Sequence, residues 1–380
     1  MTTIRKLKVM TIVGTRPEII RLSSVIKAFD KYFDHILVHT GQNWDYELNE
    51  IFFEDLKLRR PDYFLDSASY EGNLGQTMGN IISLSYNVLK KEMPDALLIL
   101  GDTNSALSTI SAKRLKVAIF HMEAGNRCFD QNVPEEINRK IVDHISDVNL
   151  PYTEHSRRYL IDEGIRKEHI FVTGSPMPEV IYENIKYIEN SNILENMSLE
   201  KDKYILVSAH REENIDNIKR LNSLAESLNT VAGIYNMPII YSTHPRSLNA
   251  INREKIKLNP AIKIAKPFGY FDYNKLQQNA YCVLSDSGTL SEESAILKFS
   301  GVLIRDSTER PEVLDKGSII IGGINAQGII QSINLSRQIN HPKDSPLPPD
   351  YTDKNVSQKV VKIIQSYTNI INQRIWQKQP

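Results

Sequence analysis

Short apolar runs alternate with longer amphipathic stretches along most of the chain. In the first half the apolar runs lie at residues 9–13, 36–39, 96–100, 117–122 and 148–150. The amphipathic stretches predict a helix that begins at Pro17 and further helices over residues 74–91, 103–115, 135–144 and 154–163. Strands that alternate with helices are typical of βαβ units around a parallel sheet. The first half of the chain therefore predicts a doubly wound α/β domain.

The pattern starts again after the turn-rich residues 174–178 and the polar stretch 190–203, with strands expected at 204–208, 239–242, 280–285 and 302–304. A chain of 380 residues also exceeds what one hydrophobic core usually supports. Residues 342–349 hold four prolines and predict a linker, and a last helix over about 356–375 is expected to pack back on the first domain. We therefore predict an α/β protein of two Rossmann-like doubly wound domains, residues 1–173 with 352–380 and residues 174–351, and a cleft between them.

The composition narrows the classes of partner. Lysine plus arginine and aspartate plus glutamate both number 46, so no net charge attracts the chain to nucleic acid or to an anionic membrane. No apolar run reaches the roughly 18 residues of a membrane-spanning helix, and the first residues lack the pattern of a secretory signal. The two cysteines, Cys128 and Cys282, lie far apart and offer neither a disulfide framework nor a cysteine-based zinc site. We expect a cytoplasmic protein with no metal, nucleic acid or membrane partner.

Polar residues at the carboxyl ends of the strands are the candidates for function, because doubly wound folds bind their ligands there. Residues 14–18 (GTRPE) follow the first strand, where the glycine permits a tight turn and Arg16 is placed to hold a phosphate. The same residues also fit an ordinary helix start with a surface arginine. Neither a Walker loop nor a GxGxxG dinucleotide motif occurs in the chain.

Three carboxylates of the first domain occupy neighbouring strand or helix ends. Asp102 and Glu123 each follow a predicted buried strand, and Glu135 opens a helix after a short loop. Taken singly, Asp102 fits a helix cap and Glu135 fits ordinary first-turn chemistry. Taken together, the three predict acid/base groups that converge on one rim. His121 and Glu123 resemble half of a zinc deaminase signature, but the Cys-x-x-Cys that such a site requires is absent.

The second domain offers groups suited to a nucleotide. His210 and Arg211 follow its first strand and are placed to meet a diphosphate, and His244 follows the next strand. The backbone N–H groups of residues 287–289 would form an anion-binding helix N-terminus, and a carboxylate one turn further, Glu293, would accept the hydroxyls of a ribose. A Ser/Thr-capped helix without a ligand is the alternative for this segment.

Eight short motifs occur in order along the chain: GTRPE at 14–18, TGQ at 40–42, GDT at 101–103, HMEAG at 121–125, PEEINR at 134–139, HREEN at 210–214, DSG at 286–288 and TERP at 308–311. Together they resemble the bacterial non-hydrolysing UDP-N-acetylglucosamine 2-epimerases, and the resemblance spans nearly the whole chain. It implies two Rossmann-like domains of the glycosyltransferase-B type in a homodimer that closes on a UDP-sugar.

The resemblance also implies roles for individual residues. Asp102, Glu123 and Glu135 match the family's catalytic carboxylates, and His210 is a fourth catalytic candidate that also meets the UDP moiety. The positions expected to bind substrate are Arg16, Arg21, Glu136, Arg139, Tyr273, Ser287, Gly288, Thr289, Glu293 and Arg310, with Glu293 at the ribose and Tyr273 near the uracil. Some members bind a second UDP-sugar as an activator, and Gln42 and His244 are the candidates for such a site here.

Three departures from the family pattern bear on the substrate. Arg21 stands where lysine is usual, Thr289 replaces a second glycine, and the loop at 126–133 is shorter than in the enzymes of the GlcNAc and ManNAc sugars. This loop is similar to that of the branch that converts UDP-2-acetamido-2,6-dideoxy-L-talose to UDP-N-acetyl-L-fucosamine for capsule or O-antigen polysaccharide. That epimerase and a UDP-sugar-dependent glycosyltransferase remain as alternatives to the UDP-N-acetylglucosamine 2-epimerase.

The chemistry of such an epimerase explains why several carboxylates are needed. The C2 proton of an N-acetylhexosamine is not activated by a carbonyl, and the chain has no nicotinamide site, so we predict a reaction without a cofactor. One carboxylate removes the C2 proton while UDP leaves C1, and UDP adds back to the 2-acetamidoglycal as a proton arrives on the other face.

Overall fold

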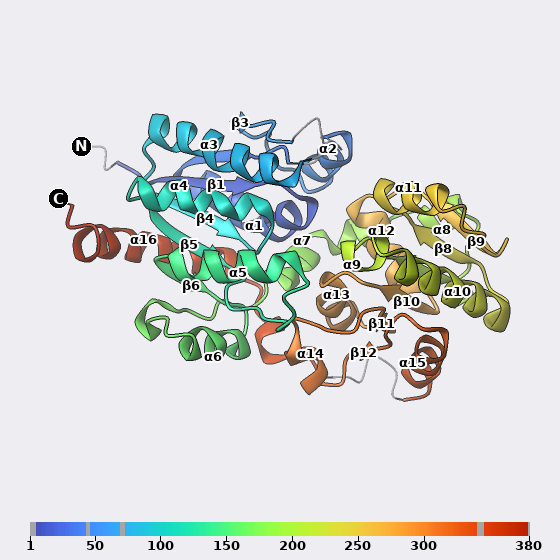
Figure 1. Cartoon of the computed structure of the whole chain (residues 1–380). Coiled ribbons are helices and arrows are strands. Elements are labelled where there is room, and N and C mark those ends of the chain that lie inside the picture. Colours follow the sequence, from blue (N-terminus) through green and yellow to red (C-terminus); the bar gives the residue numbers. More distant parts are fainter. Residues whose placement is uncertain (1–4, 43–45, 69–72, 340–345, 379–380) are drawn as a thin grey trace. The chain divides into compact units, whose positions relative to one another are not determined.

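The computed structural model describes residues 5–42, 46–68, 73–339 and 346–378, and the chain divides into two compact units (Figure 1). The first unit comprises Met1–Tyr182 with Thr352–Pro380, and the second comprises Glu183–Tyr351. The chain leaves the first unit within one helix, α7 (Met177–Glu189). The domain limits of 173/174 and 351/352 stay predictions, and residues 342–345 of the predicted linker lie outside the described residues.

The first unit is built on a parallel sheet of six strands in the order β3-β2-β1-β4-β5-β6. The strands are β1 (Lys8–Val13), β2 (Asp34–His39), β3 (Tyr63–Phe64), β4 (Ala96–Leu100), β5 (Ala118–Met122) and β6 (Val148–Leu150). The helices around it are α1 (Arg16–Tyr32), α2 (Tyr46–Asp55), α3 (Leu74–Glu92), η1 (Asn104–Leu107), α4 (Ser108–Arg114), α5 (Pro134–Ile145), α6 (Glu154–Asp162), η2 (Lys167–His169), the start of α7, and α16 (Val356–Arg374).

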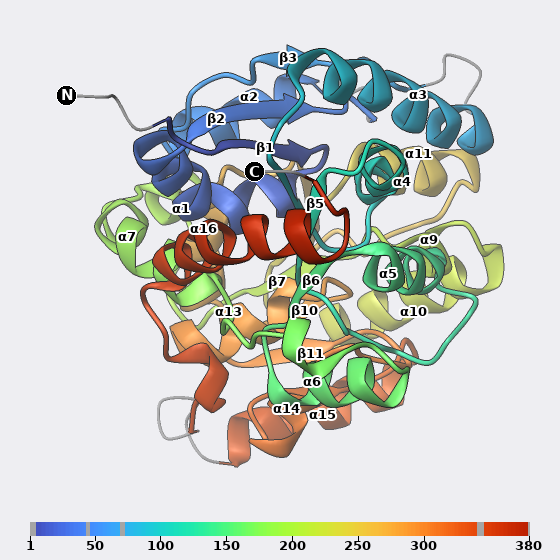
Figure 2. The ribbon, with the colours of Figure 1, turned by 90° about the vertical axis from the view of Figure 1, so that its left-hand side faces the viewer.

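Burial explains why these strands read as uninterrupted apolar runs. Every residue of β4, Ala-Leu-Leu-Ile-Leu, is buried, as expected where helices cover both faces of a parallel sheet. On one face, Met10, Leu97 and Ile99 pack with Leu89 of α3 and Ala112 of α4. The other face is covered by α1 and α16, which contact each other (Figure 2).

The last helix, α16, packs against α1 of the first unit. Val360 and Ile364 of α16 are fully buried. At the start of this helix the Glu179 carboxylate accepts hydrogen bonds from the Ser357 backbone N–H at 2.8 Å and from the Ser357 hydroxyl at 2.5 Å. The Lys359 ammonium donates to the Thr173 carbonyl at 3.0 Å. These contacts attach the start of α16 to α7 and to Thr173, in the segment before α7.

The second unit repeats the architecture with the order β12-β11-β10-β7-β8-β9. Its strands are β7 (Ile205–Ser208), β8 (Ile239–Ser242), β9 (Ile262–Ala265), β10 (Cys282–Ser285), β11 (Gly301–Leu303) and β12 (Ile320–Ile321). Its helices are the end of α7, α8 (Ile193–Asn196), α9 (Glu212–Ile215), α10 (Ile218–Tyr235), α11 (Pro245–Arg253), α12 (Tyr270–Asn279), α13 (Thr289–Leu297), α14 (Pro311–Asp315), α15 (Ala326–Gln338) and η4 (Pro349–Tyr351).

Alternate residues of β7 enter two different hydrophobic cores. Ile205 and Val207 pack in the cluster that holds residues of α10 and α15, whereas Leu206, together with Tyr204 just before the strand, packs in the cluster that holds residues of α12 and α13. Successive side chains of a strand point to opposite faces, so both faces of this sheet are buried as well. The predicted α/β class is therefore confirmed for both units.

In each sheet the strand order reverses direction between the first and fourth strands, β1 and β4 in the first unit and β7 and β10 in the second. Loops after two such strands leave in opposite directions and open a crevice at their carboxyl ends. Each unit therefore has one switch point at which a ligand site is expected.

Among the described residues, no helix combines the length and apolar character required to cross a bilayer.

The helix predicted over residues 103–115 is divided in the structure. It begins as the 3-10 turn η1, since the Thr103 hydroxyl caps this turn by accepting from the Ser105 N–H at 3.2 Å, and continues as α4. The cap is thus Thr103 and not Asp102, so helix capping does not account for Asp102.

We expect Ile364→Ala to destabilise the first unit by about 2–5 kcal/mol, because it removes a fully buried side chain between α16 and the sheet. Urea unfolding monitored by circular dichroism measures the effect. Ile375→Ala, at an exposed position just after the same helix, is the control and should change stability by less than about 0.5 kcal/mol. Equal effects of the two substitutions would show that α16 is not part of the core.

Candidate functional site

The switch point of the first unit is closed by the buried carboxyl group of Glu18. One oxygen, Oε2, accepts hydrogen bonds from the Gly14 N–H at 3.0 Å and the Thr15 hydroxyl at 2.8 Å, and Oε1 accepts from the Thr103 hydroxyl at 3.1 Å. Glu18 therefore joins the loop after β1 to the loop after β4. Burial raises the pKa of Glu18 from 4.5 to about 7, although each of these hydrogen bonds lowers it.

Asp102 lies at this switch point and is paired with an arginine. The Arg139 guanidinium, from α5, donates through Nε to Asp102 Oδ2 at 2.6 Å and through Nη1 to Glu136 Oε2 at 2.7 Å. Asn138, from the same helix, donates to the Asp102 carbonyl at 2.9 Å. The first two turns of α5 therefore hold Asp102 in place.

Glu136 is turned inward rather than toward solvent. Its side chain is 1% exposed, and it accepts hydrogen bonds from the N–H groups of Cys128 and Phe129 at 3.2 and 3.3 Å. Burial alone would raise the pKa of Glu136, but the Cys128 N–H and the Arg139 guanidinium outweigh it and hold this pKa below its usual range. Glu136 thereby fixes the loop at 126–133 that the sequence identified as unusual.

Glu123 lies beside the Asp102 turn. A Cβ atom on Gly101 would be 3.6 Å from Glu123 Oε2, which places this carboxylate against the residue before Asp102. Glu123 forms a buried ion pair with Arg21 of α1, and Asn126 donates to its Oε1 at 3.2 Å. Asp102, Glu123 and their two arginines thus gather at the carboxyl ends of β4 and β5.

The other candidates of the first unit lie at the same edge of the sheet. Glu135 is half-buried in the first turn of α5, next to Glu136. Arg16 begins α1, with its guanidinium carbon 5.8 Å from the centre of the Phe52 ring. Gln42 follows β2 and donates to the Thr103 hydroxyl at 3.4 Å.

Asp286 closes the switch point of the second unit. Its buried carboxylate accepts hydrogen bonds from the His210 N–H at 3.0 and 3.2 Å, from the Arg211 N–H at 3.0 Å and from the Asn214 amide at 3.1 Å. The His210 ring nitrogen Nδ1 lies 3.5 Å from Asp286 Oδ1, and the side chain of His210 is 39% exposed. Asp286 therefore orients the loop after β7 while His210 remains accessible.

The turn after β10 leads directly into α13, whose N-cap is Gly288. Gly288 has no side chain to cap this helix, but the Ser287 hydroxyl accepts a hydrogen bond from the Thr289 N–H at 3.4 Å and lies 3.0 Å from the Thr289 hydroxyl. The alternative of a Ser/Thr-capped helix therefore stays open. A Cβ on Gly288 would lie 2.4 Å from Glu309 Oε1, so a larger residue here would have to displace this carboxylate.

A buried charge network lies next to this turn. Glu309 accepts from Arg211 Nη2 at 3.3 Å and from Arg305 Nη1 at 2.9 Å, and Arg211 Nε donates to the Asp286 carbonyl at 3.0 Å. Arg310, which is 1% exposed, forms an ion pair with Glu292 of α13 at 3.2 Å. Arg211 and Arg310 are therefore each held by a carboxylate next to the turn that leads into α13.

The remaining candidates of the second unit occupy separate elements. Glu293 is buried in α13 and accepts from the Gln277 amide at 2.7 Å. Tyr273 lies on α12, half-buried against the core. His244 caps α11 by accepting from the Arg246 N–H at 3.3 Å, and its ring centre is 6.3 Å from that of His210.

The sequence did not reveal the buried carboxylates that accept hydrogen bonds from the loops of the candidate site. Glu18 and Asp286 were quoted within motifs without a role, and Asp143 was not considered. A signal for Glu18 existed, because a threonine followed three residues later by glutamate is the spacing of a capping box. No comparable local signal marks Asp286, whose partners are about 75 residues away along the chain.

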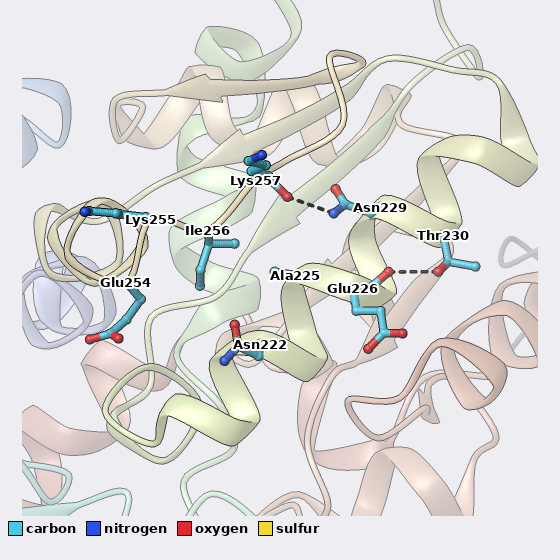
Figure 3. Close-up of a pocket in the computed structure, with 9 residues that line it drawn as sticks. All are labelled: Asn222, Ala225, Glu226, Asn229, Thr230, Glu254, Lys255, Ile256 and Lys257. Carbon is cyan, nitrogen blue, oxygen red and sulfur yellow. Dashed lines mark hydrogen bonds between the residues drawn. The ribbon is translucent and has the colours of Figure 1, made fainter.

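One surface hollow of the second unit lies apart from these residues. It is bordered by α10 and the chain after α11, where Asn229 donates to the Lys257 carbonyl at 2.9 Å (Figure 3). None of the predicted site residues lines it. Among the described residues, no three His, Cys, Asp or Glu side chains are grouped as metal ligands would be.

Two doubly wound units, with polar and charged groups at each switch point, define a two-domain α/β fold of the glycosyltransferase-B type. A family model described as UDP-N-acetylglucosamine 2-epimerase matches residues 27–365. The chain belongs to this family.

Individual relatives agree with this assignment. The UDP-N-acetylglucosamine 2-epimerase of Methanocaldococcus jannaschii is 39% identical over 338 residues, which cover 87% of this chain and 92% of the relative. The solved structure of UDP-N-acetylglucosamine 2-epimerase from Rickettsia bellii is 47% identical and covers 98% of this chain and 100% of its own, with a TM-score of 0.91. The Methanocaldococcus jannaschii enzyme solved with UDP-GlcNAc and UDP is similar at a TM-score of 0.89, with 36% identity over 94% of this chain and 99% of its own.

The raised pKa of Glu18 has a measurable effect on stability. The folded protein binds this proton more tightly than the unfolded chain does, so the free energy of unfolding should fall as the pH rises from about 4.5 to about 7. The shift corresponds to at most about 3 kcal/mol. Glu18→Gln should remove this dependence, which urea unfolding of both proteins at pH 5 and pH 8 measures. A difference in stability between the two proteins that stays constant with pH would contradict the raised pKa of Glu18.

Proposed function

We propose that the protein inverts C2 of a UDP-N-acetylhexosamine, with UDP-N-acetylglucosamine as the substrate, as a non-hydrolysing 2-epimerase. Membership of the family supports this proposal. The observation that carries it is the placement of the Glu123 carboxylate against the turn that bears Asp102, with an arginine paired to each acid. Such an arrangement suits the transfer of protons on and off one carbon atom.

The proposed reaction consists of an elimination and its reversal on the opposite face of the sugar. A carboxylate takes the C2 proton, the C2–H electron pair forms the C1=C2 double bond, and the C1–O bond breaks so that UDP leaves with its electrons. UDP then attacks C1 again while a second acid delivers a proton to the other face of C2. Asp102, Glu123 and Glu135 are proposed as the acid/base groups, and His210 as a further catalytic residue.

Ion pairing suits Asp102 and Glu123 to this role. Arg139 and Arg21 stabilise the charged carboxylates before the proton is taken, and the positive charge remains nearby when the carboxyl becomes neutral. Arg21 and Arg139 are thus proposed to act on the sugar site through these acids as well as on the substrate. The half-buried Glu135 is the third proposed acid.

The second unit is proposed to hold UDP. The N-terminus of α13, with Ser287, Gly288 and Thr289, offers backbone N–H groups to the diphosphate. Arg310 adds positive charge to this site. Glu293 and Tyr273 are proposed for the ribose and the uracil, and Arg16 is proposed to reach the diphosphate from the first unit.

Two other functions differ from this proposal in one measurable respect each. The epimerase of UDP-2-acetamido-2,6-dideoxy-L-talose would share the mechanism and is favoured only by the loop at 126–133. A glycosyltransferase would require an acceptor. NMR spectra of the protein with UDP-N-acetylglucosamine alone, and separately with the 6-deoxy-L-talo sugar, distinguish the three. A homodimer, a cytoplasmic location and an activator site at Gln42 and His244 are further proposals that rest on the family resemblance.

We expect Asp102→Asn, Glu123→Gln and Glu135→Gln each to lower kcat by about 100-fold or more, since each removes an acid/base group. Conversion of UDP-N-acetylglucosamine, followed by NMR, measures this. Asp95→Asn is the control, because Asp95 lies at the amino end of β4 and accepts from the Lys8 N–H at 2.8 Å, away from the site. Near-normal rates for all three variants would remove these residues from the mechanism.

The product formed in D2O is expected to carry deuterium at C2, with traces of free UDP and of the glycal, because the C2 proton is lost to an acid that exchanges with solvent. Mass spectrometry and proton NMR of the product test this. A product that keeps its original hydrogen at C2 would require a different mechanism.

A further inference from the structure

A buried histidine and aspartate lie behind the two turns that carry Asp102 and Glu123. His121 of β5 and Asp143 of α5 are each 1% exposed. His121 Nδ1 lies 2.9 Å from Asp143 Oδ1, and His121 Nε2 lies 2.8 Å from the carbonyl oxygen of Gly101. Neither residue has a role in the proposed chemistry, because neither reaches the surface at which substrate binds.

The Gly101 carbonyl determines which role one nitrogen of the His121 ring has in its hydrogen bond. A carbonyl oxygen only accepts, so Nε2 donates to Gly101. On the other side, Nδ1 lies 2.9 Å from the Asp143 carboxylate oxygen Oδ1, so the ring is held between the Gly101 carbonyl and the aspartate. Burial alone would raise the pKa of Asp143, but His121 and Arg127 hold it below its usual range, so the aspartate carries the negative charge.

Asp143 also holds the second turn. Its two oxygens accept from the Gly125 N–H at 3.1 and 3.2 Å, and Oδ2 accepts from Arg127 Nη1 at 2.7 Å. The same Arg127 nitrogen donates to the Asn126 carbonyl at 2.7 Å, and the Arg127 guanidinium is fixed by Glu163 at 2.6 and 2.8 Å. One aspartate therefore anchors the whole turn that follows Glu123.

Both turns use backbone conformations that need such support. Gly101 and Gly125 have φ values of +71° and +78°, and Glu123 has a φ of +65°, in the left-handed region that side chains other than glycine rarely adopt. A non-glycine residue stays in this region only where its surroundings fix it. The Gly101 carbonyl and the Gly125 N–H, which flank the two acids, are the groups that His121 and Asp143 hold.

We propose that His121 and Asp143 are a positioning pair that holds the Asp102 and Glu123 turns in register with each other. This inference rests on the proposed function of those two acids. The pair acts by linking the turn after β4 to the turn after β5 through the contact between the His121 ring and the Asp143 carboxylate. Loss of either member lets the two carboxylates shift independently, and displacements of about 1 Å in an active site reduce rates by about 100-fold.

A buried carboxylate near the amino ends of β5 and β6 provides a matched control. Asp147 lies just before β6, with its side chain 1% exposed, and accepts from the Ile119 N–H at 2.9 Å and from Lys113 at 2.6 Å. Its contacts resemble those of Asp143 in kind, but they lie at the amino ends of the strands. Asp147→Asn should therefore cost stability without moving the turns.

The test compares Asp143→Asn, His121→Ala and His121→Gln with Asp147→Asn and the unaltered protein, all below their measured Tm. Asp143→Asn and His121→Ala should lower kcat by about 10- to 100-fold and leave KM within about twofold, because the UDP groups are untouched. In His121→Gln the amide nitrogen replaces Nε2 at the Gly101 carbonyl, so this variant should recover much of kcat. A kcat within about twofold of the unaltered protein for folded Asp143→Asn and His121→Ala would overturn the proposal.

Hydrogen exchange measured by mass spectrometry gives a second result that does not depend on activity. Exchange in the peptides that contain residues 101–103 and 123–126 should become faster in Asp143→Asn and His121→Ala, but not in Asp147→Asn. If the unaltered protein converts no UDP-sugar, the proposed function is wrong, and this measurement still decides whether the pair holds the turns. Unchanged exchange in those peptides would overturn the inference.

Discussion

A parallel sheet that reverses its strand order leaves two diverging loops with unpaired N–H groups at one point, and each unit of this protein satisfies them with a buried carboxyl group. In the first unit the carboxyl comes from the first turn of α1, which follows the first strand, since Glu18 accepts from the Gly14 N–H and the Thr103 hydroxyl. In the second unit it comes from the loop after the fourth strand, since Asp286 binds the N–H groups of His210 and Arg211. The same requirement is thus met from opposite sides of the crevice.

The acids at the surface of the site depend on a second layer of charges. Asp102 and Glu123 are each paired with an arginine from a helix, and those arginines are themselves almost fully buried. Removing one partner of a buried ion pair leaves an uncompensated charge, which is far more costly than removing both. The arrangement of charge at the site is therefore fixed before a ligand binds, because little side-chain rearrangement is compatible with these pairs.

Much of the fold could be predicted from the sequence because its signals are local. The apolar runs predicted β1, β2, β4, β5, β6, β7, β8, β10 and β11, and the structure confirms them. The strands that escaped prediction, β3, β9 and β12, are edge strands: β3 and β12 have two residues each, and in β9 both Lys263 and Ile264 are exposed. Such segments lack the uninterrupted apolar run of a central strand.

For the candidate site, the sequence predicted individual residues but not their hydrogen-bond and ion-pair partners. Motifs at strand ends identified Asp102, Glu123 and His210, since position along a strand determines which edge of the sheet a residue occupies. The partners of those residues were not predictable, because Arg139 and Asp143 approach from α5 by tertiary packing alone. Spacing along the chain also favoured a capping role for Asp102 as an alternative, which the structure assigns to Thr103.

The return of α16 to the first unit has a consequence for how the chain is made. Residues of the second unit all emerge from the ribosome before α16 does, so the second sheet has its complete sequence while the first still lacks one covering helix. Until the last segment is synthesised, the surface of α1 that α16 later covers stays open to water or to a chaperone. A premature stop codon near the 3′ end of the message would therefore damage the domain that is translated first.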